Sequence, residues 1–242
     1  MPANKIKIEP ALLRRYKKQT QKRKPRQIVC RILIVCEGEK TEPNYFKAFK
    51  KYNQGTFVYD LDIKGEGMNT VQVVDRAIEL RDKAKGTETE YDRVWAVFDK
   101  DSFPPNKFNN AIIKARDNGI ECAWSNQAFE LWFLYHFQYR ISAMSRNEYK
   151  EKISAEVNKS LQYSQKNKYI YVKNDPENYS IMTTCGSQEL ALKWAETKCQ
   201  EYKDLCFHKH NPCTMVFRLV RQLIGQDEDL NKELSTVKLG HS

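Results

Sequence analysis

Acidic residues follow two apolar runs of the sequence, each at the point where the run ends. Glu37 comes directly after the run at 30–36, and Asp99 and Asp101 follow the run that ends at Phe98. Several carboxylates in one small volume cannot all stay ionised unless a cation neutralises them. Hard oxygen ligands suit Mg²⁺ or Mn²⁺, and an ion held there could activate water against a phosphodiester. The chemistry that these residues could perform is therefore metal-dependent hydrolysis.

These acidic residues need strands to bring them together. Apolar or alternating runs predict strands at 30–36, 56–63, 91–103 and 120–125. Helical spacing and caps predict helices at about 41–52, 70–86, 106–119 and 126–139. This alternation predicts an α/β fold, with a parallel sheet flanked by helices on both faces. The carboxyl ends of parallel strands share one edge, so we expect Glu37, Asp99 and Asp101 to converge there.

The second half of the chain is expected to be mainly helical. We predict helices at 145–161, 187–207 and 211–224, the last capped by Asn211, and a short strand at 168–173. The organisation that follows is an arm, a catalytic core, a helical C-terminal part packed on that core and a polar, frayed tail. Their expected bounds are 1–27, 28–140, 141–227 and 228–242.

Positive charge is concentrated at the start of the chain. Residues 1–27 hold ten Lys or Arg and one acidic residue, which is +9 of the net +10, while residues 28–242 are close to neutral. A basic arm can clamp a phosphate backbone, and Tyr16 is the one aromatic residue of this arm that could stack on a base. The other interpretation is a flexible, solubilising tail. The candidate nucleic-acid contacts are Arg14, Arg15, Lys17, Lys18, Lys22, Arg23 and Lys24.

The cysteines and the apolar runs indicate in which cellular compartment the protein is expected. The seven cysteines are odd in number and include no CxxC pair, which favours free thiols in a reducing cytoplasm. No apolar run approaches the length that spans a membrane, and none follows the basic start directly, so neither a membrane span nor a secretory signal is expected. Cys206, His208, His210 and Cys213 lie close together, but their spacing fits no standard zinc finger.

Other residues near the acidic motifs each have two interpretations. Glu42 stands in the first turn of a helix, where a carboxylate pairs with exposed N–H groups, or it joins the site. Glu130 lies in an apolar stretch, where an acid is costly without a partner, so it is either a further metal ligand or a helix cap. His136 is either a neighbour of the site or a core histidine. Glu39 is expected in solvent, and the Gly-rich stretch at 65–70 is expected to form a turn because it lacks the lysine of a phosphate loop.

The Asp-x-Asp pair has an alternative explanation, since haloacid-dehalogenase-type phosphatases use this motif. Their motif has Thr or Val two residues after the second Asp, and it follows the first strand. Here Phe103 occupies that position and the motif follows the third predicted strand. The sequence therefore disfavours that family.

The stretches LIVCEGEKTE and VWAVFDKD together resemble a Toprim domain, the metal-binding module of topoisomerases, primases and several nucleases. A closer resemblance is to the RloB-like family, small Toprim-related proteins of bacterial phage-defence loci. It is carried by CEGEKTEPNYF, FDKDSF, SNQAFELWFLYHF and NPCTMVFRLV, which span residues 36–220. The resemblance implies a Toprim-like fold and a metal-dependent nuclease of antiviral defence, often encoded beside an ATPase.

By residue, the resemblance implies that Glu37, Asp99 and Asp101 form the metal-binding and catalytic set. It also marks motif positions at Glu130, His136, Asn211 and Thr214. The leading hypothesis is therefore a Mg²⁺- or Mn²⁺-dependent nuclease that acts on DNA or RNA, tRNA included. The alternative is a non-catalytic adaptor with a degenerate Toprim core, which binds nucleic acid or docks an ATPase through the basic arm.

Overall fold

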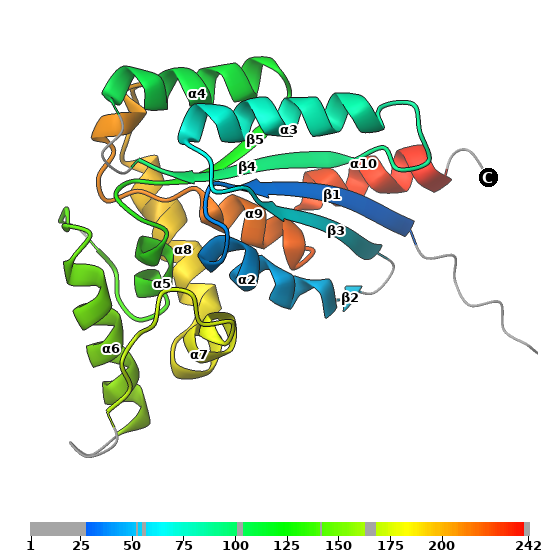
Figure 1. Ribbon diagram of the computed structural model, residues 1–242. Coiled ribbons are helices and arrows are strands. Elements are labelled where there is room, and N and C mark those ends of the chain that lie inside the picture. Colours follow the sequence, from blue (N-terminus) through cyan, green and yellow to red (C-terminus); the bar gives the residue numbers. More distant parts are fainter. Residues whose placement is uncertain are drawn as a thin grey trace, which may run out of the picture.

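A central sheet organises the chain, and it confirms the predicted α/β fold (Figure 1). The computed structural model describes residues 28–51, 53–54, 57–100, 104–140, 142–162 and 168–239. Its strands are β1 (Ile28–Cys36), β2 (Asn53–Gln54), β3 (Phe57–Gly65), β4 (Arg93–Asp99) and β5 (Glu121–Ser125). The sheet order is β2-β3-β1-β4-β5, in which β3, β1, β4 and β5 are parallel and β2 pairs antiparallel with β3.

Helices connect the strands and make up the second half of the chain. The α-helices are α2 (Thr41–Lys47), α3 (Thr70–Ala84), α4 (Pro105–Asp117), α5 (Glu130–Tyr135), α6 (Glu148–Leu161), α7 (Asn178–Cys185), α8 (Gln188–Gln200), α9 (Val216–Leu223) and α10 (Glu228–Leu239). Two short 3-10 helices, η1 (Ala48–Lys51) and η3 (Phe207–Lys209), accompany them. No helix in the described part of the chain is long and apolar enough to cross a membrane.

The sheet is covered on both faces, which explains why its central strand is a continuous apolar run. Leu33 and Val35 of β1 belong to the core under α3 and α4. Ile32 and Ile34, which point the other way, belong to the core formed with α2, α5 and the helices of the C-terminal part. Figure 1 shows α3 and α4 on one side of the sheet and α2, α5, α8 and α9 on the other. The mainly helical C-terminal part predicted from the sequence is thus present.

The strand predicted at 168–173 is wrong. The segment is extended, but its backbone pairs with side chains of α6: Tyr169 N–H donates to Oδ1 of Asn158 (2.8 Å), and Tyr171 N–H donates to Oγ of Ser154 (2.9 Å). Because the segment lies on α6, Tyr171 is buried against that helix while Ile170 and Val172 are exposed. This produces the alternation of buried and exposed side chains that is typical of a strand.

The helix predicted from Asn211 begins later, at Val216. Residues 211–214 instead run beside the end of β5, where Ser125 and Thr214 form an antiparallel bridge. The N–H of Asn126 donates to the carbonyl of Cys213 (2.8 Å). The Asn211–Pro212 peptide bond is cis. Asn211 is therefore not the helix cap that its position before a proline suggested.

The polar tail expected after residue 227 contains α10. Leu230 of this helix is buried in the core beneath β1, and Glu233 pairs with Arg93 of β4. In the sequence, Leu230, Leu234 and Val237 stand at helical spacing, a signal that the many polar residues between them obscure.

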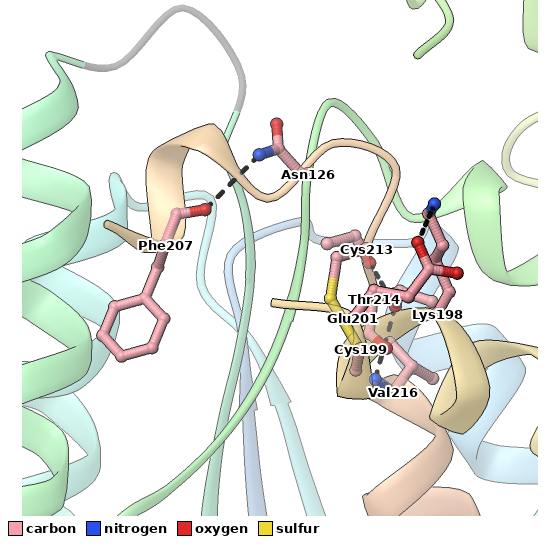
Figure 2. Close-up of a disulfide and its surroundings, with 9 residues drawn as sticks. Asn126, Lys198, Cys199, Glu201, Phe207, Cys213, Thr214 and Val216 are labelled. Carbon is pink, nitrogen blue, oxygen red and sulfur yellow. Dashed lines mark hydrogen bonds and ion pairs between the residues drawn. A yellow bond between two sulfur atoms is a disulfide. The ribbon is translucent and has the colours of Figure 1, made fainter. Parts of the chain in front are cut away.

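The expectation that all cysteines are free thiols is also wrong. Cys199 of α8 and Cys213 form a disulfide, which ties α8 to the segment that precedes α9 (Figure 2). The other cysteines within the described ranges take part in no disulfide, and three of them, Cys30, Cys36 and Cys122, are buried as expected.

Candidate functional site

Glu37 and Asp99 are brought together by neighbouring parallel strands. Cys36 of β1 pairs with Val97 of β4, and the Glu37 N–H donates to the carbonyl of Val97 (2.8 Å). The N–H of Asp99 donates to Oε2 of Glu37 (3.0 Å), so the two residues meet at the carboxyl edge of the sheet. Asp101, the third residue of the predicted set, lies outside the described residues.

Glu42 joins this pair from the first turn of α2. Its side chain is 5% exposed, and its Oε2 atom is buried without a hydrogen-bond partner. A Cβ atom on Gly38 would clash with that oxygen and would lie 3.1 Å from Cδ of Glu42. The carboxylate of Glu42 therefore rests against a glycine that leaves room for it. Glu42 lines the cavity with Glu37 and Asp99, and it also stands in the first turn of α2, so its position agrees with both interpretations.

Glu130 approaches the same volume from the start of α5. It is 6% exposed, and its Oε1 atom accepts a hydrogen bond from the hydroxyl of Tyr171 (3.3 Å). The same atom lies 3.6 Å from the ammonium of Lys173. Oε2 of Glu130 is buried without a partner, as Oε2 of Glu42 is. An unpartnered buried carboxylate oxygen is costly, which points to a ligand at this place.

The buried carboxylates act on one another. Burial raises the pKa of Asp99 well above its usual value, and the charges of Glu42, Glu130 and Glu37 raise it further. Burial likewise raises the pKa of Glu42, and the charge of Glu130 adds to this effect. Lys173 opposes both shifts. Four acidic residues therefore share one electrostatic environment.

A cavity of ≈ 360 Å³ is lined by three of these four acidic residues, and Glu130 is not among its lining residues. Its lining includes four acidic residues, which are Glu37, Glu39, Glu42 and Asp99, together with three cations. The cations are Lys40, Arg146 and Lys173. A cavity that offers both carboxylates and cations suits a divalent ion together with an anionic group such as a phosphate.

Sequence reasoning did not find the basic side of the cavity. Arg146 precedes α6, Lys173 ends the segment predicted as a strand at 168–173, and Asn174 follows that segment. Asn174 docks this segment on α2: its Oδ1 atom accepts from the hydroxyl of Thr41 (2.9 Å), and its carbonyl accepts from the side chain of Asn44 (3.1 Å). No spacing in the sequence indicates these contacts, because the partners are more than 120 residues apart.

The acidic residues fit a divalent metal ion by their chemistry. The structure brings together oxygen donors from Glu37, Glu42, Asp99 and Glu130, and two of the buried oxygens have no partner. Over the described ranges, no three His, Cys, Asp or Glu side chains already stand in an arrangement that could hold a metal. Mg²⁺ does not require such a cage, since it keeps several waters and binds through one or two carboxylates and substrate phosphates. The residues that would hold it are Glu37 and Asp99, with Glu42 and Glu130 nearest to them.

His136 lies in the core rather than at the cavity. It is 1% exposed; its Nδ1 atom is 3.0 Å from the carbonyl of Trp132, and its Nε2 atom has no partner. Burial lowers the pKa of His136 to about 4, so the ring is neutral at physiological pH. Of its two interpretations, the core histidine describes its position.

Asn211 and Thr214 also lie away from the cavity lining. The hydroxyl of Thr214 is 2.8 Å from that of Ser125, at the outer edge of β5, which gives it a structural contact. Cys213, between them, is bonded to Cys199, so it cannot serve the zinc site that the sequence disfavoured. The basic residues assigned to nucleic-acid contact lie outside the described residues: Arg14, Arg15, Lys17, Lys18, Lys22, Arg23 and Lys24.

Comparison with known families agrees with the resemblance noted above. Residues 32–223 match the family model described as RloB-like protein. The chain belongs to the RloB-like family. Neither a curated protein nor a solved structure matches it. The family match contains every residue that lines the cavity, from Glu37 to Asn174, and leaves out the basic arm and α10.

Proposed function

We propose that this RloB-like protein is a Mg²⁺- or Mn²⁺-dependent nuclease that cleaves phosphodiester bonds of DNA or RNA in bacterial antiviral defence. The observation that carries the proposal is the cavity itself, which is lined by Glu37, Asp99 and Glu42, whose Oε2 atom has no partner, together with the cations Lys40, Arg146 and Lys173. The strand-then-Glu and strand-then-Asp arrangement, shared with Toprim domains, supports it. The role in defence and a partner ATPase rest on the family alone.

The residues of the site have separable roles in this proposal. Asp99, Glu42 and Glu130 are buried and supply negative charge, while Glu37 is the most accessible of the four. We therefore assign Glu37 as the group that accepts a proton from attacking water, and Asp99 as the residue that holds the cation with it. When bound, the metal ion would polarise the phosphodiester and lower the pKa of water. Asp101 follows Asp99 closely enough in the sequence to join this set.

The test uses the full chain, with Asp99→Asn and, as a matched control, Asp117→Asn on the exposed end of α4. We expect cleavage of oligonucleotides that requires Mg²⁺ or Mn²⁺ and falls at least about a hundredfold in Asp99→Asn but not in the control. In EDTA the thermal midpoint of Asp99→Asn should not fall, because the substitution removes a buried charge from a like-charged group. Full cleavage in EDTA would refute the proposal.

A non-catalytic adaptor is the second candidate, and one contact favours it. Lys173 already pairs with Glu130, so the cluster is partly neutralised without a metal ion. An adaptor would bind no Mn²⁺ in calorimetry and cleave neither DNA nor RNA, yet it would retain nucleic acid or an ATPase on purification. The cleavage assay together with Mn²⁺ calorimetry therefore separates the two functions.

A further inference from the structure

Lys173 is held at the cavity by contacts on both sides of it. The hydroxyl of Tyr171 donates to Glu130, and the N–H of Tyr171 donates to Ser154 of α6. On the other side, Asn174 accepts hydrogen bonds from Thr41 and Asn44 of α2. The backbone of Lys173 is thus fixed between two helices. Its four-carbon stem can still move the ammonium group without moving the chain.

The contact between Lys173 and Glu130 is a loose one. The Lys173 side chain is 42% exposed and reaches inward to a carboxylate that is 7% exposed, at 3.6 Å. This distance is longer than a normal hydrogen bond, so no directional bond locks the ammonium in place. Lys173 also favours the ionised forms of Glu42 and Asp99. Lys173 therefore acts on three carboxylates from the solvent side, and Arg146 acts with it on Glu42.

We propose that Lys173 is the resident counter-ion of these carboxylates, and that it turns to a phosphate of the substrate when a divalent cation occupies them. The inference rests on the proposed function, which supplies the cation. Two added positive charges satisfy the carboxylates, and they leave the ammonium group of Lys173 as excess positive charge at the lining of the cavity. A phosphate anion is the group that this excess attracts. Cation and phosphate should then bind cooperatively through one side chain.

The proposal predicts opposite effects of one substitution on two ligands. Lys173→Met removes a cation that competes with the metal, so Mn²⁺ alone should bind at least about fivefold more tightly, by calorimetry. The same variant removes the phosphate contact. The gain in affinity that Ca²⁺ confers on labelled decamers of DNA and RNA should therefore fall at least about fivefold. A residue that only supported the fold would weaken both ligands.

The controls are Lys168→Met and Lys173→Arg. Lys168 lies on the same segment but lines a different groove, beside α6, so its variant should match the wild type in both assays. Lys173→Arg keeps the charge and should retain most of the coupling between cation and phosphate binding.

An unchanged or weakened Mn²⁺ affinity in Lys173→Met, or an unchanged effect of Ca²⁺ on oligonucleotide binding, overturns the proposal. If the wild type binds no Mn²⁺, the proposed function fails with it. If the wild type binds Mn²⁺ and cleaves, and Lys173→Met behaves identically, only the role of Lys173 fails.

Discussion

Gly38 is the residue on which the position of Glu42 depends, because only the absence of a side chain lets the Glu42 carboxylate lie where it does. We expect Gly38→Ala to push this carboxylate out of the cavity and to weaken Mn²⁺ binding by about tenfold, as loss of a supporting contact does at metal sites. Isothermal calorimetry measures this change. In a double-mutant cycle, Gly38→Ala should have no further effect once Glu42 is Ala. An additional loss would mean that Gly38 acts on something other than Glu42.

His136 should make the fold sensitive to acid. Its pKa is about 4 in the folded protein, below its usual value of 6.5, so the unfolded chain binds a proton first as the pH falls. Between pH 7 and pH 5 this difference lowers the free energy of unfolding by about 2 kcal/mol. Above pH 7 it contributes almost nothing, because the ring is neutral in both states.

Replacing the ring isolates this contribution from that of the carboxylates. His136→Phe keeps an aromatic ring beside Trp132 but cannot titrate, so urea denaturation at pH 7 and pH 5 should differ by about 2 kcal/mol less than in the wild type. Asp99 and Glu42 have raised pKa values and act in the opposite direction in both proteins. Identical pH dependence in the two proteins would contradict the prediction.

At the level of elements, the sequence predicted best where burial on both faces leaves a continuous apolar run. β1, β4 and β5 were predicted within a few residues for this reason, and the meeting of Glu37 and Asp99 follows from their parallel order. Prediction failed where a segment takes its structure from a distant partner. The segment at 168–173 alternates like a strand because it lies on α6, and residues 211–214 are drawn to the edge of β5. The part of the cavity that Lys173 and Asn174 line depends on such distant contacts.

The disulfide joins α8 to the segment of the chain that precedes α9. Cys199 and Cys213 are 14 residues apart, and closing a loop of this length stabilises a fold by up to about 3 kcal/mol. We therefore expect dithiothreitol to lower the free energy of unfolding of the wild type by up to that amount, as measured by urea denaturation. Cys199→Ser should show the lower value with or without reductant. Cys206→Ser, which changes a free cysteine, should still respond as the wild type does.

For the whole molecule, the uneven distribution of charge predicts that residues 1–27 contribute affinity for nucleic acid, while the candidate site lies in the rest of the chain. Residues 28–242 carry nearly balanced charge, whereas residues 1–27 carry +9. If the arm binds nucleic acid, its removal should reduce the slope of log affinity against log salt by roughly 3 to 6 on duplex DNA, at about 0.9 for each phosphate contact. Filter binding at several salt concentrations measures the slope.

Cleavage by the shortened protein should weaken mainly at low substrate concentration, because the arm contributes affinity rather than reacting groups. If the arm instead recruits an ATPase, its removal should leave the slope unchanged and abolish co-purification of that partner. When neither quantity changes, both roles are excluded and the arm only adds solubility.

The hydrogen bonds between Asn174 and α2 join two parts of the chain that are translated at different times. A growing chain completes β5 at residue 125, and with it the strands that carry Glu37 and Asp99, well before Lys173 has been made. A domain generally folds as a unit, so the early strands wait for the segments that are translated after them. Until residue 174 emerges, the carboxylates lack Lys173, and the cavity lacks two of the residues that line it, Lys173 and Asn174. A fragment of the chain that ends before residue 173 would therefore contain Glu37 and Asp99 but lack the cation that lies beside Glu130, so the acidic residues alone would not complete the site.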